Sequence, residues 1–410
     1  MYADQSAAEL LDKAEALIRT VHAKDAFALL EQAEQATGAT AESEDRIGFL
    51  YAVLGRSADA TEHFHKSLAL NGDFAAAHFH LGASQWLAKD YEHGLQELQK
   101  AAALAPDNPD YRYQLGAAYL ELNNFADAAS EFQQATILSP NKPAFWTNYA
   151  EASRGKGDFT TAADAYAQAV KLDPKDDTVR NSFAAALVEA RQPERAIEES
   201  QKVLAHPAAK LAEQMSARMN IGYAYLKIGE FDKAEKSYRA ALAADPKSAA
   251  GHYDLAIALK MKDRIEAAQK EFQRAIELDP SLAEAHYSLG IASWQLGNFP
   301  AAIEQMKAAI AIRPSYAEAH YMLGITLKQS GDLDAAIPEL REAIRLDPTT
   351  PGPYNTLGQI LRIKGDKPAS DEAFATGARL KKDKEGELAN TLEQGMRGGT
   401  FPKPIGSSKR

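Results

Sequence analysis

Prolines recur at a fixed interval along much of this chain. Seven of them form two series with a period of 34 residues: Pro106, Pro140 and Pro174, and then Pro246, Pro280, Pro314 and Pro348. A period of this length is typical of a helical hairpin that stacks on copies of itself, so that each copy buries the apolar face of its neighbour. The period therefore predicts a binding surface in preference to an enzyme active site.

The period extends over eleven repeats, which we number from 1 to 11 by their first residues: 7, 41, 75, 109, 143, 177, 215, 249, 283, 317 and 351. Position 8 of every repeat is Gly or Ala, and position 20 is small throughout. Position 7 is large and apolar in repeats 2 to 11, as in Leu115 and Leu323. Small sites beside large ones are what closely packed helices require.

Each repeat carries the signals for two helices joined by a tight turn. In four repeats a glycine that tolerates a left-handed backbone precedes a residue able to cap a helix: Gly157-Asp158, Gly297-Asn298, Gly331-Asp332 and Gly365-Asp366. One helix is expected to stop there and the next to start. The recurring proline ends the second helix, because it has no N–H donor and disfavours helical geometry in the residue before it.

These repeats resemble tetratricopeptide repeats, whose pattern places Leu-Gly, Tyr, Ala, Phe and Pro at fixed offsets. Repeat 4 reads Leu115-Gly116, Tyr119, Ala128, Phe132 and Pro140, and repeat 7 reads Ile221-Gly222, Tyr225, Ala234, Tyr238 and Pro246. The resemblance covers residues 7–384 and implies an all-α fold, a right-handed superhelical α-solenoid. It also implies that positions 2, 5, 9, 12 and 13 of each first helix line the concave, functional face.

Outside the solenoid at 7–384, the sequence predicts an N-terminal lead at 1–6, a C-terminal capping helix at 385–397 and a flexible tail at 398–410. The capping helix is expected to cover the last repeat, because three apolar side chains fall on one helical face: Leu388, Leu392 and Met396.

Repeat 6, residues 177–214, is irregular. It carries four extra residues, places Pro193 where the second helix begins, has Ser200 where a bulky side chain is usual, and has Ala208 where the recurring proline is expected. Packing there is expected to be weaker. The irregularity is interpreted either as an ordinary loop insertion or as a hinge.

The concave face of repeats 8 to 10 combines aromatic, aliphatic and cationic residues at positions 5, 9 and 12. We call this set the rear strip: Tyr253, Ile257, Lys260, Tyr287, Ile291, Trp294, Tyr321, Ile325 and Lys328. Tyr and Trp give a large contact area at a small entropy cost. The rear strip therefore predicts a partner with hydrophobic side chains and some acidic character. A structural role for the tyrosines is the alternative, because they belong to a common form of the repeat.

A secondary groove, which we call the front strip, is predicted at Phe79, Trp86, Tyr113 and Leu120. Binding of chaperone C-termini is not expected. By the family resemblance, repeats that clamp those termini use Lys at position 5 and Asn at position 9 of one repeat. In this chain no repeat has Lys at position 5, and none has Asn at position 9.

Composition and charge exclude several classes of function. The chain has no Cys, which excludes disulfides, thiol catalysis and Cys-based zinc sites. A net charge of −11 argues against nucleic-acid binding. No apolar run has the length needed to cross a bilayer, so membrane insertion is not expected. The residues after Met1 lack the pattern of a secretion signal, which predicts a cytoplasmic protein, or a periplasmic or secreted one if a signal was removed.

No metal site, cofactor or catalytic constellation is predicted. Histidines cluster in repeats 2 and 3, but residues two apart point to different sides of a helix: His63, His65, His78, His80 and His93. His252, His286 and His320 recur at the repeat period and are expected to be framework. The sequence contains no Gly-rich phosphate loop after a strand, no His-Glu-x-x-His and no nucleophile elbow.

The sequence thus predicts a non-enzymatic scaffold or adaptor that binds an extended or helical segment of a partner protein in its concave groove. Two alternatives are the repeat arm of a larger enzyme, such as a protein glycosyltransferase, and a self-assembling structural scaffold. The partner is expected to be a protein or peptide, and the chain itself a monomer or weakly self-associating.

Overall fold

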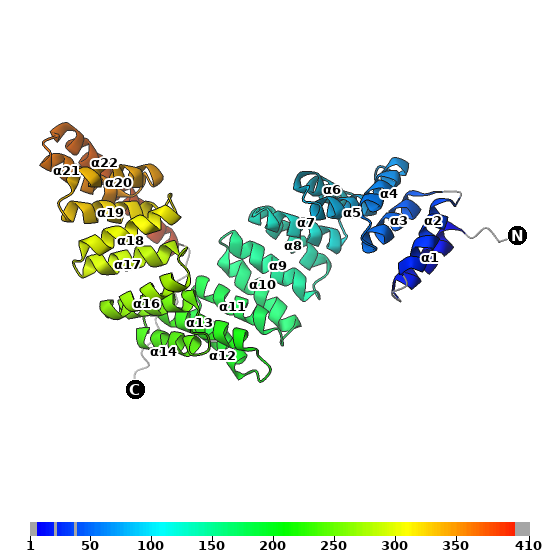
Figure 1. The fold of residues 1–410 in the computed structure, drawn as a ribbon, viewed down its shortest axis with the longest axis horizontal. Helices are drawn as coiled ribbons and strands as arrows, with labels where there is room; N and C mark the ends of the chain where they lie inside the picture. Colours follow the sequence, from blue (N-terminus) through cyan, green and yellow to red (C-terminus); the bar gives the residue numbers. More distant parts are fainter. Residues whose placement is uncertain (1–5, 20–22, 37–38, 398–410) are drawn as a thin grey trace. The chain divides into compact units, whose positions relative to one another are not determined.

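The computed structural model describes residues 6–19, 23–36 and 39–397. Within these ranges the chain forms 22 α-helices arranged as successive antiparallel hairpins, so the predicted all-α repeat fold is confirmed (Figure 1). The first helices of the repeats are α1 (Ala7–Arg19), α3 (Ala41–Val53), α5 (Ala75–Leu87), α7 (Pro109–Glu121), α9 (Pro143–Gly155), α11 (Asp177–Glu189), α13 (Leu211–Lys227), α15 (Ala249–Met261), α17 (Ala283–Gln295), α19 (Ala317–Gln329) and α21 (Pro351–Ile363). The second helices are α2 (Ala23–Glu34), α4 (Ser57–Leu70), α6 (Tyr91–Leu104), α8 (Phe125–Leu138), α10 (Phe159–Leu172), α12 (Pro193–Ala205), α14 (Phe231–Leu242), α16 (Ile265–Leu278), α18 (Phe299–Ile312), α20 (Leu333–Leu346) and α22 (Lys367–Arg397).

The extra residues of repeat 6 lie in a helix of the following repeat. Ten of the eleven first helices begin at position 1 of their repeat, but α13 begins at Leu211, four residues before residue 215. Helix α12 ends at Ala205, and Pro207 follows directly after its C-cap His206. Repeat 6 thus has a proline one position before the usual site, and the residues after it add a turn to α13.

The turns between paired helices follow the predicted chemistry. Gly157 has a φ of +84°, and the side chain of Asp158 accepts a hydrogen bond from the backbone N–H of Thr161 at 3.1 Å. The other three predicted pairs have the same positive φ and the same cap, at Asn298, Asp332 and Asp366. In each of these four repeats, the turn fixes where the second helix starts relative to the first.

The core of each repeat is a contact between position 8 and a bulky side chain at position 24. In repeat 4 a Cβ added to Gly116 would lie 2.9 Å from Cδ1 of Phe132, whose side chain is completely buried. Repeat 6 departs from this arrangement, because both residues are small there, Ala184 and Ser200. Ser200 is also completely buried, and its hydroxyl has no hydrogen-bond partner within the described ranges.

The recurring proline also joins one repeat to the next. Its carbonyl oxygen accepts a hydrogen bond from the side chain at position 4 of the following repeat. For example, Nε1 of Trp146 donates to the Pro140 oxygen at 2.8 Å. His252 lies 3.2 Å from the Pro246 oxygen through Nε2, and its Nδ1 lies 2.6 Å from Glu271. Equivalent contacts are made by His286, His320, Arg112, Arg180 and Tyr354. The framework role expected for the periodic histidines is confirmed.

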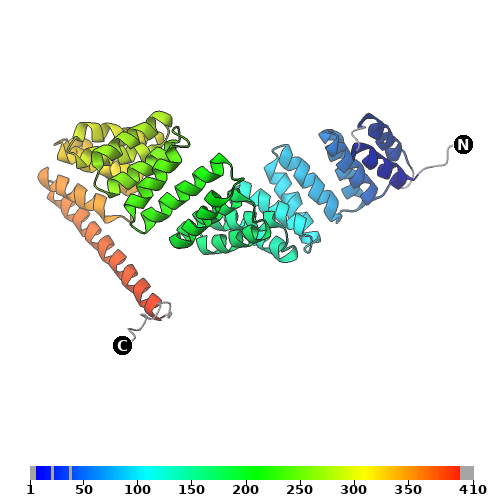
Figure 2. The ribbon, with the colours of Figure 1, turned by 90° about the horizontal axis from the view of Figure 1, so that it is seen from below.

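The contacts divide the chain into two compact units, Met1–Ala209 with repeats 1 to 6 and Lys210–Arg410 with repeats 7 to 11. At the C-terminus the structure differs from the prediction: residues 385–397 are not a separate helix but the last turns of α22, which runs without a break (Figure 2). The side chains expected to cap the last repeat, Leu388, Leu392 and Met396, lie outside the described part, as do residues 1–5 and the tail at 398–410.

Candidate functional site

The rear strip lies on α15, α17 and α19, all within the C-terminal unit. Positions 5, 9 and 12 share one face of each helix because they are separated by four and three residues. All nine side chains are half-buried, so each gives part of its surface to packing and part to solvent. The same three positions in three successive repeats therefore form one row.

The tyrosines of the rear strip pack within their own repeats or against the next one. The ring of Tyr253 lies 5.7 Å from that of Phe272, and the ring of Tyr287 lies 5.0 Å from that of Tyr316 in the same repeat. Tyr321 packs against the next repeat so closely that a Cβ on Gly352 would lie 2.6 Å from its hydroxyl oxygen. Each tyrosine thus leaves only part of its ring for a partner.

Positions 9 and 12 of the rear strip carry isoleucine, tryptophan and lysine side chains. Ile257 and Ile291 lie at the margin of the core. The indole N–H of Trp294 donates to Gln329 of the next repeat, and Lys328 donates to Gln359. Lys260 has no ion pair in the described ranges, and burial lowers the pKa of its ammonium group. An acidic group of a partner placed beside Lys260 would supply the ion pair that this cation lacks and would favour its charged form.

The front strip is used more heavily for packing. Phe79 stacks on Tyr111 with ring centroids 4.6 Å apart, and Tyr113 stacks on Phe145 at 4.7 Å. Trp86 occupies position 12 like Trp294 and makes the equivalent bond to the next repeat, with its indole N–H 2.6 Å from Glu121. The two tryptophans are therefore structural counterparts in the two units.

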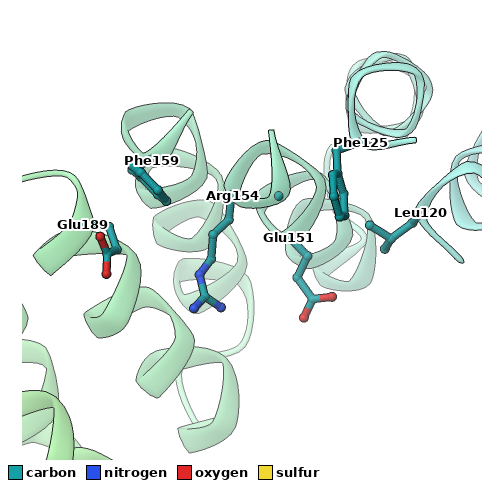
Figure 3. A pocket seen from close by; sticks show the side chains of 7 residues that line it. Leu120, Phe125, Glu151, Arg154, Phe159 and Glu189 are labelled. Carbon is teal, nitrogen blue, oxygen red and sulfur yellow. The ribbon is translucent and has the colours of Figure 1, made fainter. Parts of the chain in front are cut away.

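Leu120, the last member of the front strip, lines an open cavity of about 600 Å³ in the N-terminal unit. Figure 3 shows Arg154 between Glu151 and Glu189, with Phe125 and Phe159 on either side. Gly155 lets the ring of Phe125 lie directly against α9, because a Cβ there would clash with that ring. Arg154 is exposed and forms no ion pair within the described part of the chain.

Sequence reasoning did not select these cavity residues. Phe125 and Phe159 stand at position 17, where an aromatic residue recurs in repeats 3, 4, 5, 7 and 9, and that recurrence was the available signal. A smaller hollow of about 300 Å³ surrounds Thr147 and Asn148 on α9, the helix that also carries Arg154. It lies where Thr147 replaces the aromatic residue found at position 5 of repeats 3 and 4.

Asp254, at position 6 of α15, was also not selected. It is half-buried and makes no hydrogen bond or ion pair with any residue in the described ranges. Burial raises the pKa of its carboxyl group to about 6. An unpaired carboxylate withdrawn from water is costly, which makes Asp254 unusual among the acidic residues of the fold.

Four of the five clustered histidines of repeats 2 and 3 lie beside carboxylates: His63, His78, His80 and His93. His63 lies 2.7 Å from Glu44 through Nδ1, and His80 lies 2.8 Å from Asp45. Among the residues that the structure describes, no three His, Asp or Glu side chains gather as a metal site would require. None of the described helices has both the length and the apolar character needed to cross a bilayer.

Comparison with known structures shows the same fold elsewhere. The crystal structure of yeast Tom70 is 14% identical, with a TM-score of 0.50 and 97% of both chains covered. A crystal structure of MamA is 28% identical, with a TM-score of 0.39 over 40% of this chain and 97% of that one. The Cut9–Hcn1 hetero-tetramer of APC/C gives 16% identity and a TM-score of 0.43, covering 92% of this chain and 88% of that one.

No curated protein sequence matches the chain. A family model described as tetratricopeptide repeat matches residues 48–109, 113–177, 253–317 and 294–351, and a second model with the same description matches residues 216–248. Together these stretches cover more than half of the 410 residues. The chain therefore belongs to the tetratricopeptide repeat family.

Proposed function

We propose that the chain is a non-enzymatic scaffold that holds an extended or helical segment of a partner protein against the rear strip. The observation that carries the proposal is the row of half-buried aromatic and aliphatic side chains at equal positions in repeats 8 to 10. Such residues contribute most of the binding energy in protein interfaces when a partner removes their remaining surface from water.

The repeat spacing favours an extended segment. Neighbouring helices pack roughly 8–10 Å apart, and an extended peptide advances about 3.3 Å per residue, so each repeat would meet about every third residue. Apolar side chains of the partner would lie over the isoleucines at position 9. An acidic side chain would lie near Lys260, where it meets a cation with no partner in the described ranges.

The matched tryptophans give a direct test. Trp294→Ala removes a large surface from the rear strip, whereas Trp86→Ala removes the equivalent surface and hydrogen bond in repeat 3. Proteins captured from the source cells are identified by mass spectrometry, and the affinity of one purified partner is then measured for both variants. We expect Trp294→Ala to weaken binding by about 2 kcal/mol or more and Trp86→Ala to leave it unchanged.

The cavity lined by Leu120, Phe125 and Arg154 is the second candidate surface. The observation that favours it is that Arg154 forms no ion pair in the described part of the chain. Arg154→Ala removes an exposed side chain without disturbing the core. If this variant loses the partner while Trp294→Ala keeps it, the binding surface belongs to the N-terminal unit. If Trp294→Ala, Trp86→Ala and Arg154→Ala all bind the partner as tightly as the wild type does, both candidate surfaces are wrong.

A further inference from the structure

Asp254 interrupts a regular contact between neighbouring repeats. Position 6 of one repeat normally meets position 5 of the repeat before it. The side-chain amide of Asn148 donates to the hydroxyl of Tyr113 at 2.7 Å, and Nδ1 of His80 lies 2.8 Å from Asp45 in the same way. These pairs satisfy polar groups that would otherwise be withdrawn from water without a partner.

Repeat 7 breaks the series because its position 5 is Met219. A thioether has no hydrogen to donate, so the carboxylate of Asp254 receives nothing from this neighbour. Neither of its oxygens is among the fully buried polar atoms that lack partners, so the carboxylate keeps some contact with solvent. The site is a half-buried acceptor without a donor.

Two tyrosine hydroxyls interact electrostatically with this acceptor. In repeat 2, position 6 contacts position 9 of the preceding repeat, where Nη2 of Arg46 lies 2.6 Å from Glu15. The equivalent neighbour of Asp254 is Tyr223. Burial raises the pKa of the Tyr238 and Tyr253 hydroxyls, and the negative charge of Asp254 adds to both shifts, so both hydroxyls lie within its electrostatic reach.

We propose that Asp254 anchors a lysine or arginine side chain of the segment bound at the rear strip. A carboxylate supplies the opposite charge and accepts the hydrogen bonds of such a cation. Arginine suits the site better than lysine, because its guanidinium is more weakly hydrated and can make two parallel hydrogen bonds to a carboxylate. The inference rests on the proposed function, since it assigns one contact of the same bound segment.

The test uses the full chain and displayed random peptides of about 12 residues, enough to span four repeats at roughly three residues each. Peptides enriched by the wild type are expected to share an Arg or Lys at one position. Replacing that Arg by citrulline, its neutral analogue, or replacing the anchor by Asp254→Asn should each weaken binding at least about tenfold. Combining the two changes should cost little more than either one alone.

Glu304→Gln is the control, because it removes an exposed carboxylate from α18 in the same unit. It should bind like the wild type. If the wild type binds the citrulline peptide undiminished, or Asp254→Asn binds the Arg peptide undiminished, the anchor is wrong. The proposed function stays intact in that case, provided that Trp294→Ala still weakens binding. If the wild type enriches no peptide, both the anchor and the proposed function are wrong.

Discussion

Gly222 on α13 lies so close to Tyr238 on α14 that a Cβ added to the glycine would stand 2.6 Å from the Cε1 atom of the ring. Real Cβ atoms essentially never approach another heavy atom to within 3.0 Å, so the ring occupies the space that any other residue would need. The tyrosine is itself completely buried. This pair is the position 8 to position 24 contact of repeat 7.

We therefore expect Gly222→Ala to lower the free energy of unfolding by about 1–3 kcal/mol, because the added methyl group forces the ring or the backbone to move. Gly386→Ala is the matched control. Gly386 lies in α22, is exposed, and has nothing within 4 Å of its added Cβ, so alanine should instead stabilise by about 0.5–1 kcal/mol through helix propensity. Urea-induced unfolding followed by circular dichroism measures both, and equal shifts would contradict the close contact.

The hydroxyl of Tyr238 is buried and has no hydrogen-bond partner in the described ranges. Tyr238→Phe removes this unsatisfied group while keeping the ring, so stability should be unchanged or rise by up to about 1 kcal/mol. The comparison is Tyr51→Phe, since the hydroxyl of Tyr51 donates to Glu34. That variant should lose about 1 kcal/mol. A loss of stability in Tyr238→Phe would mean that the hydroxyl has a partner after all.

Two buried serines offer a similar contrast at the irregular repeat. Ser200 and Ser370 are both completely buried, but Oγ of Ser370 donates to the Gly358 carbonyl at 2.8 Å, whereas Ser200 has no partner in the described part of the chain. Ser200→Ala should leave thermal stability unchanged or raise it, and Ser370→Ala should cost about 1 kcal/mol. Thermal unfolding of both variants, followed by circular dichroism, tests both expectations. Destabilisation by Ser200→Ala would point to an unseen hydrogen bond in repeat 6.

Most of the fold could be predicted because the repeat period places small and large residues together in most of the eleven repeats. The period failed where the chain departs from it. Pro207 ends α12 one position early, which frees the following residues for α13. At the C-terminus, Lys382 stands where a proline would stop the helix, and α22 runs on through Gly386.

The surface was harder to predict than the fold. Positions 5, 9 and 12 follow from the period, but the amount of each side chain left exposed depends on its neighbours in the next repeat. Gly352 lets Tyr321 pack against the next repeat, and Gly155 lets Phe125 lie against α9 beside the cavity. Asp254 was missed because its isolation results from Met219, which lies in a different repeat, 35 residues earlier.

The raised pKa of Asp254 gives a prediction about pH. The folded state holds the Asp254 proton more tightly than the unfolded state, because its pKa rises from 3.8 to about 6. Above pH 6 the buried charge therefore lowers stability, by about 3 kcal/mol at most, and this cost fades as the pH falls toward 4. Asp254→Asn removes the charge and should stabilise the chain at pH 7.5 by about 1–3 kcal/mol, with little effect at pH 4.

Other carboxylates act in the opposite direction, so wild type and variant must be compared at each pH. Hydrogen bonds from Thr350 and Thr349 lower the pKa of Asp347 to about 2, for example, and stabilise the fold as the pH rises. The difference in urea midpoint between Asp254→Asn and wild type cancels such shared terms and should grow between pH 4 and pH 7. Glu304→Gln, which removes an exposed charge, should show a flat difference over the same range. A flat difference for Asp254→Asn as well would show that its carboxylate is fully hydrated in the folded chain, and would remove the electrostatic reason for expecting a cation there.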